Sequence, residues 1–561
     1  MMQATHNPQD AGWIQSRLAC LPFQHHAAIQ REYANLYQTA GQHDGEKRRN
    51  ANLYLMDLAD HAPQNVFTLS DEEIRRKADR LALECRKLFR LARDPAQAVT
   101  TGMGFYEAAG FDPQSMAIYD APGIIGRLSD AEFWKRKLTR RQDRQQEAFA
   151  IHLGVVRRGR GLYVSESLFM TMQARIQSSI RALSALEAIN EDTGETVDML
   201  QVLKSGVSNP EVRRVELMVR MRGFEDAATK AGHVGMFYTL TCPSKFHRYT
   251  AGSDTNPKYT GATPREAQAY LTALWARMRS KFKRDSLTAY GFRVAEPHHD
   301  ACPHWHMLLF VDPAQREAVT AIIQHYALLE DGDERGAEKY RFKAVEIDAS
   351  KGSATGYIAK YVSKNINGYA VDEDFEGGVD SADSSQRVRA WASLWGIRQF
   401  QQIGGAPVGV WRELRRVRDT LPDGLLEAAR QAADTGDWCA YLELQGGVLA
   451  LRKDQPLKVY TVERINEDTG EIISNQYGEI VAKTDGVELL AGIQQIKTRL
   501  HVWRIQAKAG ATAPENAFNA AVEYVEGFNI LTPSPSSSSS SSAPWSPVNN
   551  CTQTDEREVW G

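Results

Sequence analysis

The sequence lacks the features of secreted, membrane-spanning and disulfide-bonded proteins. No apolar run approaches the roughly 18 residues that a membrane-spanning helix needs, and the first residues, MMQATHNP, are not a basic segment followed by an apolar one. The six cysteines are scattered and include no Cys-x-x-Cys pair, so they form no zinc site of the usual spacing and fit a reducing compartment. We therefore expect a cytoplasmic protein with no membrane partner.

An excess of charge of one sign is also missing. The formal net charge is only -3, so composition alone does not indicate a nucleic-acid binder, and any DNA-binding surface must come from local patches. The hydrophobic content of 42% and charged content of 24% are typical of a soluble globular protein. A chain of 561 residues is too long for one ordinary core, so we expect three or four structural units.

The patterns along the chain divide it into four regions. Residues 1–230 have mainly helical apolar spacing and are basic in places; Ser70 is the expected N-cap of one helix, with Glu73 three residues later. Residues 231–420 alternate between strands and helices, and residues 421–530 contain further helices and a hairpin without recognisable chemistry. The Ser/Pro-rich residues 531–561 cannot bury a core, so we expect a disordered tail.

Basic clusters in two regions allow more than one interpretation. Residues 135–141 and 157–160 are rich in Lys and Arg, which favours solvated helix faces and leaves a duplex-DNA platform as the alternative. In residues 387–418, Arg and Trp are interleaved. These side chains either stack on and clamp a single DNA strand or pack as ordinary amphipathic helices.

The heptapeptide INEDTGE occurs twice, at residues 189–195 and 465–471. Asp-Thr-Gly between apolar residues is favourable turn chemistry, so each copy is predicted to form the tip of a hairpin. We see no wider repeat, and a shared turn sequence is favoured over duplicated domains.

The central region predicts an α+β fold. Strands are expected at residues 236–243, 287–296, 304–311 and 342–347, and helices at 263–284, 313–329 and over the stretch that follows the last strand. The resulting β-α-β-β-α-β-α order indicates an antiparallel sheet flanked by helices, not a parallel doubly wound sheet.

A pair of histidines in this region suggests a metal site. His304 and His306 alternate along an apolar run, so on a strand both imidazoles point to one face. Glu296 ends the preceding strand of the same hairpin, so its carboxylate can meet both imidazoles across the turn. Two imidazoles and a carboxylate suit a divalent cation, Mg²⁺ or Mn²⁺. His298 and His299 lie near the turn and are weaker candidates for a third ligand or a phosphate contact.

A pair of tyrosines suggests the nucleophiles. Tyr357 and Tyr361 are four residues apart, so on a helix their hydroxyl groups emerge side by side, and Lys360 and Lys364 can add positive charge beside a phosphate or lower a tyrosine pKa. A phenol with a pKa of about 10 is a poor nucleophile unless its proton is lost or its target is polarised, as a bound cation would do. These parts together predict a 5′-phosphotyrosyl intermediate and a free 3′-hydroxyl group on DNA.

Three motifs also carry a family resemblance. FYTLT at residues 237–241, EPHHDACPHWHMLLF at 296–310 and GYIAKYVSKN at 356–365 resemble the ordered motifs of HUH-type rolling-circle initiators, and more closely those of the replication gene A protein family of phages and prophages. The specific resemblance covers roughly residues 230–420. One departure is Ala301, where a glycine is expected in the turn.

The resemblance implies a fold, a function and partners. The central unit is expected to be an HUH nickase domain with an RRM-like or ferredoxin-like sheet, in which His304 and His306 bind the metal and Tyr357 and Tyr361 attack DNA. The chain would nick an origin in supercoiled duplex DNA with site and strand specificity, stay on the 5′ end and rejoin the strand after one round of rolling-circle phage replication. A host helicase and polymerase would be its partners in a bacterial cell.

Two alternatives remain open at this stage. A two-tyrosine transposase or a plasmid relaxase would use the same chemistry. A non-catalytic RRM-like binding module belongs to a different class, but the expected strands lack the paired aromatic residues with which such sheets stack RNA bases.

Overall fold

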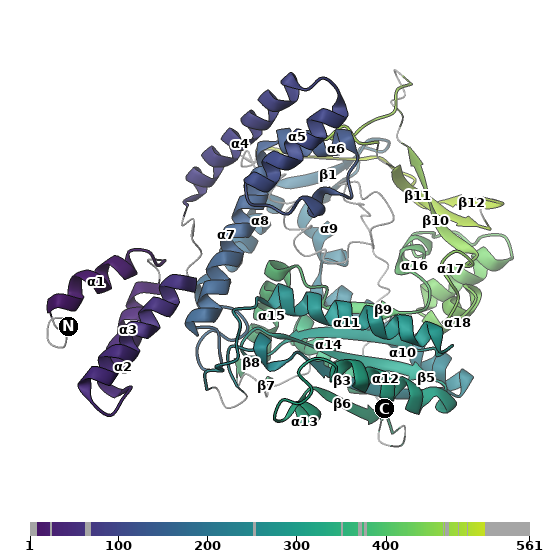
Figure 1. The fold of residues 1–561 in the computed structure, drawn as a ribbon. Coiled ribbons are helices and arrows are strands. Elements are labelled where there is room, and N and C mark those ends of the chain that lie inside the picture. Colours follow the sequence, from purple (N-terminus) through teal and green to yellow (C-terminus); the bar gives the residue numbers. More distant parts are fainter. Residues whose placement is uncertain are drawn as a thin grey trace.

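The structure is a computed structural model, shown in Figure 1. It describes residues 8–22, 25–61, 69–250, 254–348, 350, 352–368, 373–374, 379–463, 465, 470–480, 482–490 and 492–510. The tail predicted to be disordered at residues 531–561 lies outside the described residues. No helix in the described ranges is long and apolar enough to cross a membrane.

The N-terminal region is mainly helical, as predicted. The predicted helix start at Ser70 is confirmed, because the Ser70 hydroxyl accepts from the Glu73 amide and the Glu73 carboxylate accepts from the Ser70 amide. The elements before the central sheet are α1 (Pro8–Leu18), α2 (His26–Thr39), α3 (Asp44–His61), α4 (Asp71–Leu91), α5 (Pro95–Ala108), η3 (Pro113–Met116), α6 (Ala121–Ser129), α7 (Ala131–Leu153), α8 (Glu166–Ser184), β1 (Leu186–Asn190), β2 (Thr196–Asp198), α9 (Met199–Ser205) and α10 (Pro210–Ala231).

The central unit is built on a five-stranded sheet that is antiparallel throughout, with strand order β6-β3-β5-β4-β9. The predicted antiparallel α+β arrangement is confirmed, and a short edge strand, β9, is added to it. Its elements are β3 (Val234–Thr241), η4 (Ser244–Phe246), α11 (Pro264–Arg284), β4 (Tyr290–Pro297), β5 (Pro303–Val311), η5 (Pro313–Gln315), α12 (Arg316–Ala327), α13 (Ala337–Tyr340), β6 (Phe342–Glu346), α14 (Ala354–Ile366), β7 (Glu373–Asp374), β8 (Val379–Asp380), α15 (Ser381–Trp395) and β9 (Phe400–Ile403).

The two faces of this sheet bury two separate cores. Trp305 and Met307 lie in the first core, together with α11, α12, α15 and residues of the segment that runs from α7 into α8, such as Tyr163. Phe237 and Val294 lie in the second core, together with α10 and α14. Because alternate residues of a strand point to opposite faces, β3, β4 and β5 each supply both cores. The helical N-terminal region therefore shares a core with the sheet, while the boundary placed at residue 230 stays a prediction.

The C-terminal part returns to the N-terminal helices (Figure 1). β13 pairs antiparallel with β1, from Leu186 opposite Ala507 to Asn190 opposite Trp503. We call residues 457–507 the C-terminal strap. Its elements and the helices before it are α16 (Val408–Leu414), α17 (Leu425–Thr435), α18 (Trp438–Leu444), β10 (Leu457–Glu463), β11 (Ala482–Leu489), β12 (Gln494–Lys497) and β13 (Trp503–Ala507).

The strap is also fixed to the N-terminal helices by side chains. Arg127 of α6 donates two hydrogen bonds to the Glu479 carboxylate, at 2.7 and 3.0 Å, and its guanidinium lies 3.5 Å from the Tyr119 ring and 4.4 Å from the Tyr477 ring. The Tyr477 hydroxyl accepts from Arg136 at 2.9 Å. The strap therefore contacts α16 through β10 and β11, α6 through Tyr477 and Glu479, and β1 through β13.

The two copies of the repeated heptapeptide lie in this region and near β1. The first copy is the predicted hairpin tip, because β1 pairs antiparallel with β2 and Ile189 lies opposite Thr196. In the second copy, Ile465 and Ile472 form an antiparallel bridge, but residues 466–469 lie outside the described residues.

Candidate active site

The β4–β5 hairpin brings the predicted metal ligands together. Glu296 is the register partner of His304, and Val294 is that of His306, so all three candidate ligands lie on the sheet face that α14 covers. The two Nε2 atoms of His304 and His306 are 3.0 Å apart, and Glu296 Oε2 is 4.0 Å from His306 Nε2. All three side chains are buried, and their ligand atoms lie within 4.8 Å of one another.

The turn of this hairpin contains the residue at which a glycine was expected. Ala301 has φ 69°, in the left-handed region that costs an L-residue roughly 1–2 kcal/mol. Hydrogen bonds hold it there: its amide donates to the His298 carbonyl at 2.8 Å, and the Trp391 indole donates to its carbonyl at 2.9 Å. The alanine is thus accommodated, and the register of the two strands is kept.

The surroundings keep both imidazoles neutral. Burial and the nearby Lys364 and His298 lower the pKa of His306 to about 3. Burial and the neighbouring His306 and Lys364 hold the pKa of His304 well below its usual value. His306 Nδ1 is hydrogen-bonded to the Thr239 hydroxyl at 3.2 Å, which orients the ring. Neutral imidazoles with a fixed orientation are the form in which histidine binds a metal.

The donor set fits a divalent cation. Neighbouring ligands of an octahedral ion with bonds of about 2.1 Å are about 3 Å apart, which matches the spacing of the two imidazole nitrogens. A carboxylate oxygen completes a set of two nitrogens and one oxygen, which suits Mn²⁺ and Mg²⁺.

The tyrosines lie on α14, whose start is fixed by two residues. The Ser353 hydroxyl accepts from the Gly356 amide at 2.9 Å, and the Glu225 carboxylate of α10 accepts from the amides of Ala354 and Thr355 at 2.6 and 3.2 Å. A carboxylate at a helix N-terminus is stabilising there. One face of the helix enters the second core through Ala354, Ile358, Val362 and Ile366.

The neighbouring face of α14 places the tyrosines beside the candidate metal ligands. The Tyr361 ring lies 4.2 Å from the His306 ring, centroid to centroid. The Phe237 ring contacts both tyrosines, with its centroid 4.7 Å from that of the Tyr357 ring and 5.3 Å from that of the Tyr361 ring. Tyr357 is 37% exposed and Tyr361 is half-buried, so Tyr357 lies at the mouth of the site and Tyr361 lies inside it.

The two predicted lysines lie in different places. Lys360 is exposed, with Nζ 5.3 Å from the Tyr357 ring centroid and 4.8 Å from that of Tyr361. Lys364 lies deeper, with Nζ 3.7 Å from Glu296 Oε2 and 5.8 Å from the ring of Tyr163. Lys360 can therefore meet a phosphate that approaches the tyrosines, whereas Lys364 also offsets the charge of the buried carboxylate.

The sequence interpretation missed two residues. Asn365 is fully buried, and its amide donates to Glu296 Oε1 at 2.6 Å and to the Tyr361 carbonyl at 2.6 Å. The sequence contained one signal for this role, because Asn365 is a polar residue on the apolar face of the tyrosine helix. His247, from the loop after β3, is hydrogen-bonded to the buried Asp300 at 3.2 Å. Nothing in its local sequence marks that contact.

His298 and His299 are not part of the three-ligand group. The His298 ring instead stacks on that of His304 at 4.0 Å and packs edge-on against His247 at 5.1 Å. Burial raises the pKa of Asp300, but the attraction of His247 and then of His298 and His299 outweighs it and holds that pKa well below its usual value. The His298 ring therefore connects His304 to His247, whose ring is hydrogen-bonded to Asp300.

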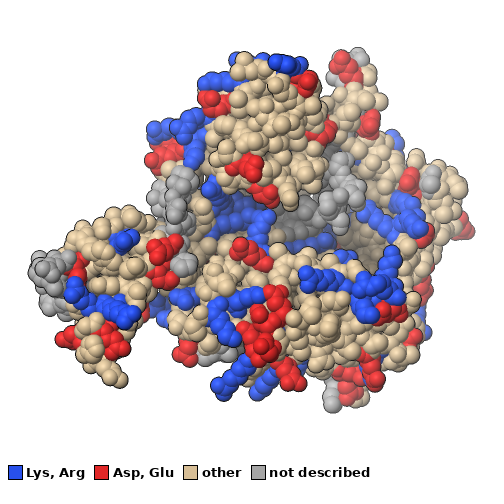
Figure 2. Space-filling view, in the orientation of Figure 1, with Lys and Arg blue, Asp and Glu red and all other residues tan. Residues whose placement is uncertain are grey.

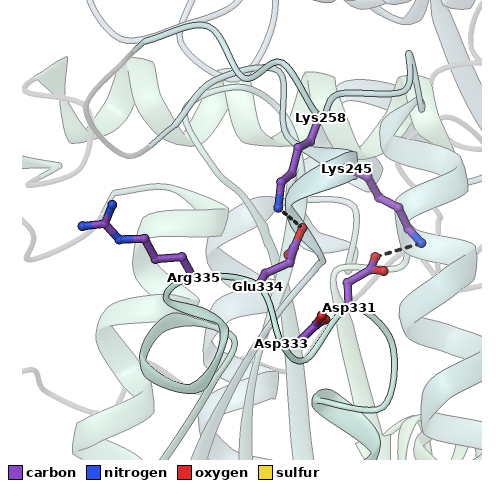
Figure 3. A pocket seen from close by; sticks show the side chains of 6 residues that line it. All are labelled: Lys245, Lys258, Asp331, Asp333, Glu334 and Arg335. Atoms are coloured by element: carbon purple, nitrogen blue, oxygen red, sulfur yellow. Dashed lines mark hydrogen bonds and ion pairs between the residues drawn. The ribbon is translucent and has the colours of Figure 1, made fainter.

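Two other features are not part of this site. A pocket of about 470 Å³, drawn in Figure 3, is lined by charged residues, two pairs of which form ion pairs, such as Lys258 with Glu334 at 3.1 Å. It contains none of the candidate ligands or tyrosines. Trp391, Trp395 and Trp411 are buried in the two cores, so the interpretation of residues 387–418 as an aromatic clamp for DNA is wrong and ordinary packing is correct.

Comparison with known proteins gives the same relationship as the motifs. The family model for the bacteriophage replication gene A protein matches residues 108–369. The probable replication protein P12 of Pseudoalteromonas phage PM2 is 36% identical over 84% of this chain and 78% of its own length. The replication gene A protein of Escherichia phage 186 is 41% identical over 77% of this chain and 60% of its own length.

A third relative, from a prophage-like region of Escherichia coli O6:H1, is named a probable replication endonuclease and is 34% identical over 69% of this chain. The match spans 49% of that relative, about half its length. No solved structure gives a significant match to the chain. The chain belongs to the bacteriophage replication gene A protein family.

Proposed function

We propose that this chain is a site- and strand-specific DNA endonuclease and transesterase that starts rolling-circle phage replication. The five-stranded sheet with α14 would be its HUH nickase domain. The observation that carries the proposal is the contact between the Tyr361 ring and the His306 ring, 4.2 Å apart, because it joins a nucleophile to a candidate metal ligand. The endonuclease name of one relative is in keeping with this activity.

Glu296, His304 and His306 would hold Mg²⁺ or Mn²⁺. The cation would withdraw charge from a non-bridging phosphate oxygen, which eases attack on phosphorus. The chain itself keeps both imidazoles neutral by burial and orients His306 through Thr239. Asn365 and Lys364 fix the Glu296 carboxylate from the tyrosine helix.

The reaction would be a balanced transesterification. The Tyr361 oxygen forms a bond to phosphorus and the bond from phosphorus to the 3′ oxygen breaks, so the phenol loses a proton and the 3′ oxygen gains one. Lys360, which lies above both tyrosine rings, would attract the phosphate and stabilise its charge. Since the tyrosyl ester keeps the energy of the phosphodiester, a later attack by a 3′-hydroxyl group reseals DNA. Tyr357 would make the second cut while Tyr361 holds the first end.

The partners would follow from this chemistry. The substrate would be an origin in supercoiled duplex DNA, which supplies a single strand to the site, and the protein would stay covalently on the 5′ end. The free 3′ end would be extended by a host polymerase, with a host helicase opening the duplex ahead of it.

The proposal is tested by nicking of supercoiled DNA from the genome that encodes the chain, with Mg²⁺ or Mn²⁺, followed by denaturing gels that show covalent protein–DNA adducts. We expect an adduct with the wild type and none with the Tyr357→Phe/Tyr361→Phe double variant. The control Tyr340→Phe changes a 68% exposed tyrosine outside the site and keeps the adduct. An adduct that persists in the double variant would disprove the proposal.

The metal role has a separate test. His304→Ala should abolish nicking at every Mg²⁺ or Mn²⁺ concentration, whereas His325→Ala, which changes an exposed histidine of α12, should not. Normal nicking by His304→Ala would disprove the proposed role of the metal but not that of the tyrosines.

A further inference from the structure

A row of cations on α7 faces the start of α11. Lys137, Arg140 and Arg144 are three and four residues apart, so they lie on one face of the helix, and their charges interact with that of Arg265 in the first turn of α11. We call these four residues the cation recess. Figure 2 shows the molecule hollowed between the N-terminal helices and the sheet unit, with Lys and Arg side chains visible inside the hollow.

A carbonyl group and aromatic rings contact two residues of the cation recess. Arg144 Nε donates to the Leu394 carbonyl at the end of α15 at 2.7 Å, and Lys137 Nζ lies 5.2 Å from the Phe133 ring centroid. Within the described part of the chain, no carboxylate forms an ion pair with Lys137, Arg144 or Arg265. Among the described residues, the positive charge of these three side chains is therefore not paired with a carboxylate.

The like charges in the recess also oppose one another. Burial, followed by Arg140 and Arg144, lowers the pKa of Lys137 to about 8. Burial, followed by Arg265 and Arg140, lowers the pKa of Arg144 to about 9. Repulsion among these cations therefore destabilises the fold, and a bound anionic polymer would relieve that repulsion.

We propose that the cation recess binds the phosphate backbone of single-stranded DNA on its way to the tyrosines. This inference rests on the proposed function. α15 connects the two places: its Leu394 carbonyl accepts from Arg144, and its Trp391 indole bonds to Ala301 in the hairpin turn of the candidate ligands. α15 also packs against α14, which carries the tyrosines.

A single strand fits the recess better than a duplex does. Lys137 and Arg144 are only partly exposed, between α7, α11 and α15, so a phosphate must enter the recess to reach them. A single strand bends freely and can follow such a recess, whereas duplex DNA is stiff over about 150 base pairs and would contact only the exposed Arg140 and Arg265.

The test compares two triple variants with equal charge change. Lys137→Gln/Arg140→Gln/Arg265→Gln removes three cations of the recess. The control Arg277→Gln/Arg279→Gln/Lys283→Gln removes three exposed cations from the other end of α11. The probe is a fluorescein-labelled 30-nucleotide oligothymidylate in EDTA, with anisotropy measured at several NaCl concentrations. Losing three phosphate contacts should make the slope of log K against log salt shallower by about 2 in the recess variant.

The control variant should keep the wild-type slope. An unchanged slope in the recess variant, or an equal change in both variants, would overturn the proposal. A loss seen with a 30-base-pair duplex but not with the single strand would overturn the choice of ligand. If the triple variant does not fold, the exposed single change Arg140→Glu must still weaken single-strand binding for the proposal to stand.

This experiment is independent of the test of the proposed function. Binding in EDTA needs neither a metal nor a tyrosine, whereas adduct formation needs both. A chain that binds single strands through the recess but forms no adduct would refute the transesterase alone. A chain that forms the adduct with an unchanged salt slope in the recess variant would refute the recess alone.

Discussion

Asn365 donates a hydrogen bond to Glu296 at 2.6 Å and thereby ties the helix of the tyrosines to the carboxylate of the candidate metal site. Both residues are buried, at 0% and 1% exposure, so water cannot replace the bond. The same amide donates to the Tyr361 carbonyl. One side chain therefore contacts both the tyrosine helix and the third candidate ligand.

Replacing the Asn365 amide should weaken metal binding more than it weakens folding. We expect Asn365→Ala to lower the affinity for Mn²⁺ about 10- to 100-fold, as loss of a group that orients a ligand typically does. The measurements are Mn²⁺ binding by electron paramagnetic resonance and the Mn²⁺ concentration that gives half-maximal adduct formation. Ser363→Ala removes another buried polar group from α14 and should leave both unchanged. Equal effects of the two variants would mean that Asn365 has only a structural role.

The different depths of the two tyrosines predict different roles. Tyr361 lies against His306 and should make the first cut, whereas Tyr357 is 37% exposed and should make the second. Tyr361→Phe is expected to lower the rate of the first nick more than about 1,000-fold, because it removes the nucleophile. Tyr357→Phe should keep that nick and lose strand transfer to a second oligonucleotide. Single-turnover assays with labelled strands measure both steps, and the reverse pattern would exchange the two roles.

Glu147 predicts a dependence of stability on pH. Its carboxylate is 1% exposed and accepts from the Ser165 amide at 2.7 Å. Burial raises the pKa of Glu147 to about 7, against the opposing effect of the bonds from Ser165. The folded protein holds the Glu147 proton more tightly than the unfolded chain does, so this proton stabilises the folded state. The stabilisation is complete at a pH below the pKa of Glu147 in the unfolded chain, and it is lost as the pH rises through about 7. The loss is at most about 3 kcal/mol.

Glu147→Gln cannot ionise, so it should remove this dependence. When the pH is raised from 5 to 8, the Tm measured by thermal unfolding should fall by a few degrees more for the wild type than for the variant. Other titrating groups affect both proteins equally and cancel in the difference. If the two curves run parallel, Glu147 titrates normally in the folded protein.

The pair between Arg127 and Glu479 should hold the strap on the N-terminal helices. Its side chains are 9% and 17% exposed, and breaking one partner of such a pair typically costs about 3–5 kcal/mol. Arg127→Ala should therefore release the strap and speed tryptic cleavage near Lys497 and Arg499, as identified by mass spectrometry. Arg76→Ala breaks a largely exposed pair with Glu72 and should not change the cleavage rate. Unchanged cleavage in Arg127→Ala would show that the β1–β13 pairing alone holds the strap.

Much of the site follows from local periodicity. His304 and His306 share a face because a strand repeats every two residues, and Tyr357 and Tyr361 share a face because a helix repeats every 3.6. Glu296 opposite His304 follows from the short hairpin that joins their strands. These relationships need only a few neighbouring residues, which is why the sequence alone could predict them.

The parts that the sequence did not predict depend on distant partners. Nothing in residues 186–190 or 503–507 identifies the other as its strand partner, although they pair along their whole length. The interleaved Arg and Trp residues suit a buried helix face and an exposed clamp equally well, and only the tertiary packing of Trp391 and Trp411 decides between them. Asn365 acquires its role only when the tyrosine helix packs over the hairpin.

The pairing of β1 with β13 has a consequence for chains shortened at their C-terminal side. It joins residues 186–190 to residues 503–507, so a strand from the last described part of the chain completes the small sheet of the N-terminal region. A chain cut before Trp503 would leave this edge of β1 unpaired. An unpaired strand edge is a template for pairing with another chain, so such a shortened protein should associate with itself more readily than the full chain.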